Sequence, residues 1–315
     1  MHGLRAARDK LARLPYHGDV RPAREHAMLP FLDEDVVRAH LRWDALIAAM
    51  EEALIAFSAG RVQQPVRRFL TIDRYEGFFG IMPAASEAVM GIKLVTFYPN
   101  NAARGLPTHL AMIQLFSPET GEALALIDGR LITEMRTAAV SAAATKALAA
   151  PDAKVLAILG SGVQARAHVE ALRRVRAFEE IRVWGRTRAH AERFAGEVGA
   201  RAMAAEDAVR GADVVVTATA ATEPILTGAW LKPGAHVNAI GWRGHTSREL
   251  DDTAMANVVV VESREAAHDQ CGDVILSGAE IYAELGEILA GDKPARAEQT
   301  TVFDSVGIAV EDIAA

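Results

Sequence analysis

The sequence predicts an α/β fold: a doubly wound parallel sheet joined to a smaller α+β domain. The chain has 315 residues, about twice the ~150 residues of an average domain. Its composition, 50% hydrophobic and 24% charged, is typical of a globular protein with a large core. After Pro151, short apolar segments alternate with helical ones, which is the pattern of parallel β-α-β units.

The composition also excludes several classes of protein. The net charge of −7 argues against a general nucleic-acid binder. The only cysteine, Cys271, excludes an intrachain disulfide and fits a reducing cytoplasm. No apolar run reaches the ~18 residues of a membrane-spanning helix, and the ten histidines show no metal-ligand spacing. We therefore expect a cytoplasmic protein with no membrane, nucleic-acid or metal partner.

The first half of the chain predicts helices around a group of strands. Residues 1–27 carry six basic side chains and no apolar run, so we expect a poorly ordered extension, with the structured part beginning at Met28. One helix is expected from Asp33 to Gly60, and an Ala-rich, buried helix from about Thr133 to Ala149. The strands expected between them are Val66–Ile72, Phe78–Met82, Val89–Tyr98, Leu110–Phe116 and Ala123–Ile127.

The second half predicts the alternating pattern itself. Helices are expected at 164–174 and 189–198. The strands expected around them are 154–159, 181–184, 213–219, 235–240 and 258–261. The segment after Gly272 is mixed and is a candidate for returning to the first domain.

A glycine-rich turn follows the first of these strands. The residues Gly160, Ser161, Gly162, Val163, Gln164 and Ala165 form a G-x-G-x-x-A motif between a strand and a helix. The first glycine permits a tight turn, the second lets a pyrophosphate approach the backbone, and the alanine permits close helix packing. The helix N-terminus then offers free N–H groups to phosphate. The motif predicts dinucleotide binding by a Rossmann-type domain.

The end of the next strand indicates which dinucleotide is bound. An acid at this position binds the adenosine ribose of NAD. Here Gly185 stands in that place, followed by Arg186, Thr187 and Arg188. Because guanidinium groups bind phosphate bidentately, the loop favours the 2′-phosphate of NADP(H), with NAD(H) as the alternative. The other reading is a solvated basic loop that caps the next helix.

Several ordered segments resemble the ornithine cyclodeaminase/mu-crystallin family over about Leu32 to Asp312. Besides the Gly160–Ala165 turn, the segments that carry the resemblance are 64–67, 93–98, 136–141, 184–187, 221–226, 248–252 and 301–305. The likeness is greatest to the mu-crystallin members, which are NADPH-dependent ketimine reductases. The resemblance implies a homodimer. It also implies a substrate-binding and dimerisation domain of residues 28–150 and 295–315, and an NAD(P)-binding domain of residues 151–294.

Three cations stand in apolar surroundings within the first domain. Arg67 lies in a strand, Lys93 interrupts an apolar run, and Arg136 lies in the Ala-rich helix. Such groups are costly to bury without an anion. Each either pairs with a buried carboxylate or binds the anion of a substrate. The resemblance implies the second, with all three as catalytic residues that hold the α-carboxylate of the substrate.

The resemblance also implies further contacts with the cofactor. In the matching positions, Arg136 and Thr137 approach the cofactor phosphates, Thr108 lies near the cofactor, and Val306 and Gly307 lie beside the nicotinamide, with Gly307 also near the substrate. Further cofactor residues are expected from the sequence at Thr217, Ala218, Thr219, Asn238, Ala239, Ile240 and Gly241. Most of them follow strands, and ligands bind at the carboxyl ends of parallel strands.

The sequence departs from the cyclodeaminase pattern after residue 240. Cyclodeaminases carry an acid there that accepts the proton of the ornithine amine, whereas Arg243 is the aligned residue here. A cation cannot act as this base. Arg243 or His245 could bind a second anionic group of the substrate, or Arg243 could be a rim residue. Asp304 could contact the substrate amine or hold its loop, and the proton donor is left open because Gln270 stands near a position where relatives have an acid.

These observations predict an oxidoreductase that uses NAD(P)H to reduce the C=N bond of a small 2-imino or cyclic ketimine carboxylate, giving an amino acid. Two alternatives of the same class are an ornithine cyclodeaminase and an alanine dehydrogenase-like enzyme. An alternative of another class is a non-catalytic, NADPH-dependent protein that binds a small ligand.

Overall fold

The structure is a computed structural model that describes residues 29–241 and 244–315, in two compact units. Unit 1 comprises the residues up to Leu41, Gly60–Thr133 and Ala309–Ala315. Unit 2 comprises Arg42–Ala59 and Glu134–Ile308. The extension expected at residues 1–27 lies outside the described residues.

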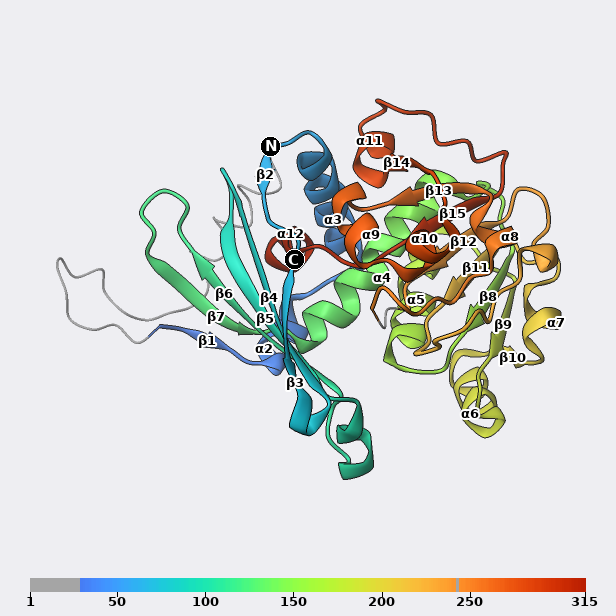
Figure 1. Cartoon of the computed structure of the whole chain (residues 1–315), viewed down its shortest axis with the longest axis horizontal. Helices are drawn as coiled ribbons and strands as arrows, with labels where there is room; N and C mark the ends of the chain where they lie inside the picture. Colours follow the sequence, from blue (N-terminus) through green and yellow to red (C-terminus); the bar gives the residue numbers. More distant parts are fainter. Residues whose placement is uncertain (1–28, 242–243) are drawn as a thin grey trace. The chain divides into compact units, whose positions relative to one another are not determined.

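Unit 1 is built on a seven-stranded sheet with the order β1-β7-β6-β5-β4-β2, and β3 pairs with β4 (Figure 1). Its pairs are antiparallel except for the parallel pair of β1 and β7. The strands are β1 (Phe31–Leu32), β2 (Val62–Gln63), β3 (Arg68–Ile72), β4 (Gly77–Ser86), β5 (Met90–Phe97), β6 (His109–Phe116) and β7 (Ala123–Asp128). The helices are α2 (Glu34–His40), α12 (Ala309–Ala314) and the short 3₁₀ helices η1 (Asp73–Tyr75) and η2 (Pro99–Arg104).

The two faces of this sheet differ in burial. On one face, Met82, Lys93, Ile113 and Ile127 stand in register across β4 to β7 and are buried, and α12 packs on this face. The opposite face is also apolar but open in the single chain. It consists of half-exposed and exposed side chains, which include Leu70, Phe79, Ile81, Leu94, Leu110, Met112, Leu124 and Leu126.

Unit 2 contains an eight-stranded sheet in which every pair is parallel, in the order β10-β9-β8-β11-β12-β15-β13-β14. The strands are β8 (Val155–Leu159), β9 (Glu180–Trp184), β10 (Arg201–Ala202), β11 (Val214–Thr217), β12 (His236–Ala239), β13 (Val258–Val261), β14 (Ile281–Glu284) and β15 (Thr301–Asp304). From β8 the chain adds β9 and β10 on one side and then β11 and β12 on the other side. The strand order therefore reverses between β8 and β11, which is the switch point of a doubly wound fold. The predicted fold class is confirmed.

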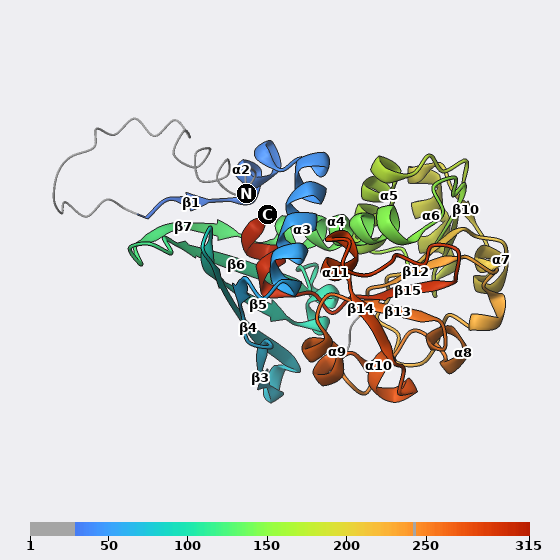
Figure 2. The same ribbon diagram turned by 90° about the horizontal axis from the view of Figure 1, so that it is seen from above.

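Helices cover both faces of this sheet. Figure 2 shows α4, α5 and α6 on one side and α8, α9 and α10 on the other. The helices are α3 (Trp43–Ser58), α4 (Arg130–Leu148), α5 (Val163–Val175), α6 (Arg188–Val198), α7 (Ala205–Val209), α8 (Asp252–Met255), α9 (Arg264–Gln270), α10 (Gly272–Ser277), α11 (Leu285–Leu289) and the 3₁₀ helix η3 (Gly228–Trp230). Within residues 29–241 and 244–315, no helix has the length and apolar character needed to cross a bilayer.

The structure corrects two expectations about the elements. The single helix expected from Asp33 to Gly60 is two helices, because Leu41 and Arg42 adopt extended backbone conformations between α2 and α3. The boundaries between the units also differ. Residues 295–308 do not return to the first domain, because β15 pairs with β12 and β13 inside the second sheet. Residues 134–150 likewise cluster with unit 2, and only Ala309–Ala315 return to unit 1.

A buried polar network joins α4 to its neighbours. His168 of α5 bonds with Ser141 of α4 at 2.9 Å and with the Gln164 carbonyl at 2.8 Å. Nearby, the Asn238 amide donates to Thr145 of α4 at 2.9 Å. Burial lowers the pKa of His168 to about 4, so this ring is neutral in the folded protein at physiological pH.

We predict that His168 makes the folded state less stable in acid. Between pH 6.5 and about 4 the unfolded chain binds a proton at His168 that the folded chain does not, so stability falls as the pH falls. His168→Gln removes this proton uptake. Urea unfolding at pH 7 and pH 5 should show a pH-dependent loss about 2 kcal/mol smaller in the variant than in the natural protein.

The matched control is His190→Gln, which changes an exposed histidine on α6. The reduction of the pH-dependent loss should be larger in His168→Gln than in this variant. An unchanged pH dependence in His168→Gln would contradict the prediction.

Candidate functional site

The turn between β8 and α5 is shaped to accept a phosphate. Gly160 has φ +140, and a Cβ there would lie 2.4 Å from the Ala218 carbonyl oxygen, so only glycine fits. Gly162 is the N-cap of α5 and has no side chain to bond the first N–H groups of the helix. Ala165 is fully buried behind the turn, as the motif predicts. The N-terminus of α5 is therefore left to bind an anion.

The end of β9 lies beside this turn. The Gly160 N–H donates to the Trp184 carbonyl at 2.8 Å, and a Cβ on Gly185 would lie 3.2 Å from Ser161 Oγ. The next three residues, Arg186, Thr187 and Arg188, are exposed. Arg188 forms an ion pair with Glu192 one turn along α6, at 2.7 Å. Both arginines thus project from the strand end at which the adenosine ribose binds in this fold.

The ends of β11 and β12 carry the next group of predicted residues. Thr217 and Ala239 end these paired strands, and the Ile240 N–H donates to the Thr217 carbonyl at 3.0 Å. Asn238 uses its side-chain amide in the core network, and its residue is paired with β11 and with β15 in the sheet. The sequence did not single out the residue that joins these ends: the Glu249 carboxylate accepts from the Thr219 N–H at 2.8 Å and the Gly241 N–H at 2.9 Å.

Arg136, Val306 and Gly307 come together within unit 2. Gly307 has φ +75, and a Cβ there would lie 2.7 Å from an Arg136 guanidinium nitrogen. Glu262 accepts hydrogen bonds from the N–H groups of Val306 at 3.2 Å and Gly307 at 3.3 Å, and from the Ser305 hydroxyl. Burial raises the pKa of Glu262, and the charge of Arg136 opposes that rise. Arg136 therefore has a buried carboxylate as an electrostatic partner. Glu262 directly follows the apolar strand β13, and an acid at the carboxyl end of a parallel strand is a signal that the sequence itself contains.

The other two predicted cations lie in unit 1. Lys93 is only 1% exposed, and its ammonium donates to Asp312 of α12 at 2.7 Å. A lysine buried among apolar residues needs an anion beside it, and Asp312 is that anion. The Arg67 guanidinium lies over the Phe69 ring at 5.2 Å. Thr108, carried over as a cofactor residue, precedes β6 in unit 1 and is half-buried.

Three predicted residues remain: Arg243, His245 and Thr137. Arg243 lies outside the described residues, so its place is left open. His245 is exposed in the segment after β12. Thr137 is half-buried next to Arg136 on α4.

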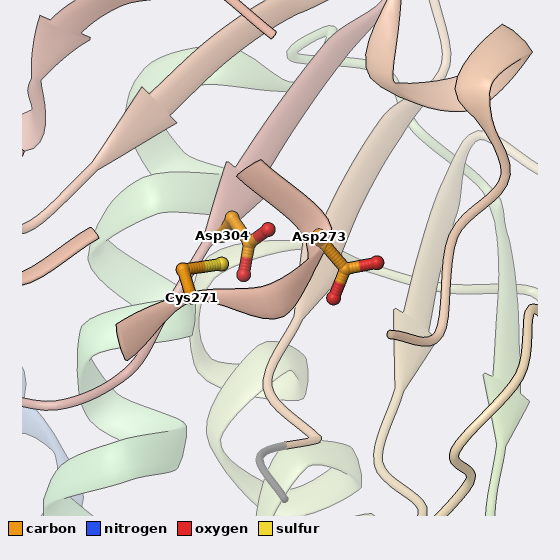
Figure 3. Close-up of side chains that lie close together, drawn as sticks. All are labelled: Cys271, Asp273 and Asp304. Atoms are coloured by element: carbon orange, nitrogen blue, oxygen red, sulfur yellow. The ribbon is translucent and has the colours of Figure 1, made fainter. Parts of the chain in front are cut away.

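Asp304 belongs to a buried cluster that sequence spacing could not reveal. Figure 3 shows its carboxyl group with the Cys271 thiol turned toward it, and their ligand atoms and an Asp273 oxygen all lie within 4.8 Å of one another. Burial raises the pKa of Asp304 well above its usual value, and the Asp273 charge adds to this rise. A rise in pKa favours the neutral form of the acid, which attracts a substrate ammonium less strongly than a carboxylate does. Of the two roles considered for Asp304, holding its loop fits better.

Comparisons with known proteins agree with this architecture. The model of the ornithine cyclodeaminase/mu-crystallin family matches residues 27–315. The chain is 50% identical over 295 residues to ketimine reductase mu-crystallin of Rattus norvegicus, covering 90% of this chain and 94% of that protein.

Two solved structures are similar over almost the whole chain. The first is Delta(1)-pyrroline-2-carboxylate reductase of Thermococcus litoralis in complex with NADH and L-proline, with a TM-score of 0.87, 35% identity, and coverage of 91% of this chain and 94% of that one. The second is an archaeal alanine dehydrogenase dimer with bound NAD, with a TM-score of 0.86, 33% identity, and coverage of 91% and 93%. With the family model matching nearly the whole described chain, the protein belongs to the ornithine cyclodeaminase/mu-crystallin family.

Proposed function

We propose that the protein is an NAD(P)H-dependent oxidoreductase that reduces the C=N bond of a small 2-imino or cyclic ketimine carboxylate to an amino acid. The observation that carries the proposal is the 50% identity to a ketimine reductase over 90% of the chain. The L-proline in the complex of a similar reductase, a cyclic amino acid, supports a small cyclic substrate.

Unit 2 provides the groups that suit the cofactor, with NADP(H) favoured. The uncapped N-terminus of α5 and the glycine turn before it suit the pyrophosphate. Arg186 and Arg188 suit the 2′-phosphate, because no acid stands at Gly185. When bound, the dihydronicotinamide supplies the hydride that the imine carbon accepts.

The cations supply the recognition of the substrate carboxylate. We assign this role to Arg67, Lys93 and Arg136, as the resemblance implies. Asp312 accepts a hydrogen bond from the Lys93 ammonium and so fixes its position, while Glu262 and the turn at Gly307 hold Arg136. Pre-positioned donors of this kind lose little freedom when an anion binds. We keep Arg243 and His245 as candidates for a second anionic group.

We predict that the purified protein oxidises NADPH with 1-piperideine-2-carboxylate, 1-pyrroline-2-carboxylate or a simple imino acid. Loss of absorbance at 340 nm measures the rate. No turnover of any of these substrates despite NADPH binding would instead favour a ligand-binding protein. Ammonia release from ornithine with catalytic NAD would favour a cyclodeaminase. Turnover of pyruvate with ammonia, without turnover of either cyclic imine, would favour an alanine dehydrogenase.

The same assay tests the assignment of Arg67 with a neighbouring control. Arg67→Gln should lower kcat/KM for the imine about 10- to 100-fold, which corresponds to a charge-assisted hydrogen bond of about 1.5–3 kcal/mol. NADPH binding should change little. Arg61→Gln alters an exposed arginine that precedes β2, and it should behave as the natural protein does.

We predict that the arginines after β9 set the preference for NADP(H). Arg186→Gln combined with Arg188→Gln should weaken NADPH binding at least 10-fold, because a bidentate phosphate contact is lost. NADH binding, measured by the same fluorescence titration, should change less than about 2-fold. Arg193→Gln, an exposed change within α6, is the control. Equal weakening of both cofactors would contradict the assignment.

We further propose that the protein acts as a cytoplasmic homodimer formed through the open apolar face of the unit 1 sheet. Leu70, Leu110 and Leu124 are 45–55% exposed there, next to half-exposed apolar neighbours in register. An apolar face of this extent is typical of a subunit interface. The alanine dehydrogenase of similar fold is a dimer. The buried, free thiol of Cys271 fits a reducing compartment.

We predict that Leu110→Glu dissociates the dimer. A carboxylate placed in the centre of an apolar interface is desolvated without a partner. Light scattering after size-exclusion chromatography should show the natural protein at twice the chain mass and the variant at the mass of one chain. Leu276→Glu, at an equally exposed leucine on α10, should stay dimeric.

A further inference from the structure

Glu249 is a buried carboxylate that links two neighbouring strand ends of unit 2. It is 1% exposed, and it lies in the segment after β12. One carboxylate oxygen accepts from the Thr219 N–H at 2.8 Å and from the Thr219 hydroxyl. The other oxygen accepts from the Gly241 N–H at 2.9 Å. Thr219 follows β11 and Gly241 follows β12, so a single side chain holds both ends.

The backbone of Glu249 is itself held from two sides. Its N–H and that of Leu250 donate to one oxygen of Asp273, at 3.0 and 2.7 Å. Its carbonyl accepts from the N–H groups of Ile225 and Leu226, at 2.8 and 3.0 Å. These four hydrogen bonds fix the backbone of Glu249. The position of its carboxylate therefore determines where the N–H groups of Thr219 and Gly241 lie.

The fit between Glu249 and Gly241 leaves no spare room. A Cβ on Gly241 would lie 2.2 Å from the carboxyl carbon of Glu249, so residue 241 must be glycine for the carboxylate to reach its N–H. An amide or hydroxyl could not replace this carboxylate, since only a group with two acceptor oxygens can serve both strand ends at once.

The arrangement is costly, which indicates that it serves a purpose beyond packing. Burial raises the pKa of Glu249 to about 7, and the neighbouring charge of Asp273 adds to the rise. Apolar side chains would fill the same space without this desolvation penalty. The strand ends that Glu249 joins lie next to the Gly160 turn, because a Cβ on Gly160 would meet the Ala218 carbonyl just before Thr219.

We propose that Glu249 is a positioning residue for the cofactor: it sets the spacing between the ends of β11 and β12 that face the bound dinucleotide. This inference rests on the proposed function, since it assumes a dinucleotide at these strand ends. Glu249 touches neither cofactor nor substrate in this role and acts only through Thr219 and Gly241. It therefore acts on NADPH and NADH alike, unlike the arginines after β9.

The test is Glu249→Gln, measured by fluorescence titration of NADPH and of NADH, with thermal unfolding in parallel. The amide keeps the shape but offers one acceptor oxygen, so one strand end loses its bond and meets an N–H donor instead. We expect both cofactors to bind at least 10-fold more weakly. KM for NADPH should rise by the same factor, and kcat at saturating NADPH should change less than 3-fold.

Asp251→Asn is a control for the change from carboxylate to amide at a half-exposed acid in the same segment of the chain. Asp251 also accepts from two N–H groups and one hydroxyl, those of Gly228 at 2.9 Å, Ala254 at 2.8 Å and Thr253 at 2.7 Å. It contacts the start of α8 and η3 rather than the ends of β11 and β12. All three bonds go to the same oxygen, Oδ1, which the asparagine amide retains, so we expect natural thermal stability and natural cofactor affinity.

The outcomes separate this inference from the proposed function. If the natural protein binds neither NADPH nor NADH, the proposed function fails. If it binds them and Glu249→Gln binds them equally well, only the inference is overturned, and the same holds if Asp251→Asn weakens binding as much. If Glu249→Gln does not fold, Glu249→Asp keeps the charge but is too short to reach both ends. Natural affinity in that variant would overturn the inference, and weaker binding of both cofactors would support it.

Discussion

Burying a carboxylate is expensive unless donors surround it, and this constraint shapes the carboxyl edge of the second sheet. Loss of water around an ion costs several kcal/mol after relaxation of the protein. Glu249 and Glu262 each meet the constraint by accepting backbone N–H groups from loops that follow strands. The same bonds that satisfy the two acids therefore fix those loops. The contacts that a cofactor would need at this edge are therefore formed before it binds, because the hydrogen bonds that satisfy the buried acids also hold the loops.

The same constraint explains the lysine in the first sheet. Lys93 stands in register with Met82 and Ile113, where an apolar side chain would ordinarily be found. Asp312 reaches it from α12, a helix more than 200 residues away in the chain. The pair ties the C-terminal helix to the sheet and holds an ammonium at one point on that face. The opposite face contains no comparable charge among the described side chains of β5, and its apolar character suits a subunit interface.

Local patterns predicted much of the fold because local forces produce it. The glycine motif at Gly160 and the strands before and after it depend on interactions over a few residues. Predictions were poorer where distant contacts decide. The break between α2 and α3 has no strong local signal, and the apolar segment at 301–304 could pair in either sheet. Its place between β12 and β13 follows from hydrogen bonds to strands 40 to 65 residues earlier.

The sequence alone determined the parallel α/β domain, the dinucleotide turn, the basic loop at Arg186 and the family likeness, since these are written in short motifs and their order. It also identified Lys93 and Arg136 as cations that need anions. Only the tertiary structure decided which anions these are, Asp312 and Glu262, and only it revealed Glu249 as the link between two strand ends. The physical reason is that a buried charge is balanced by whatever group the fold brings beside it. That group can be far away in the chain, so the local sequence does not identify it.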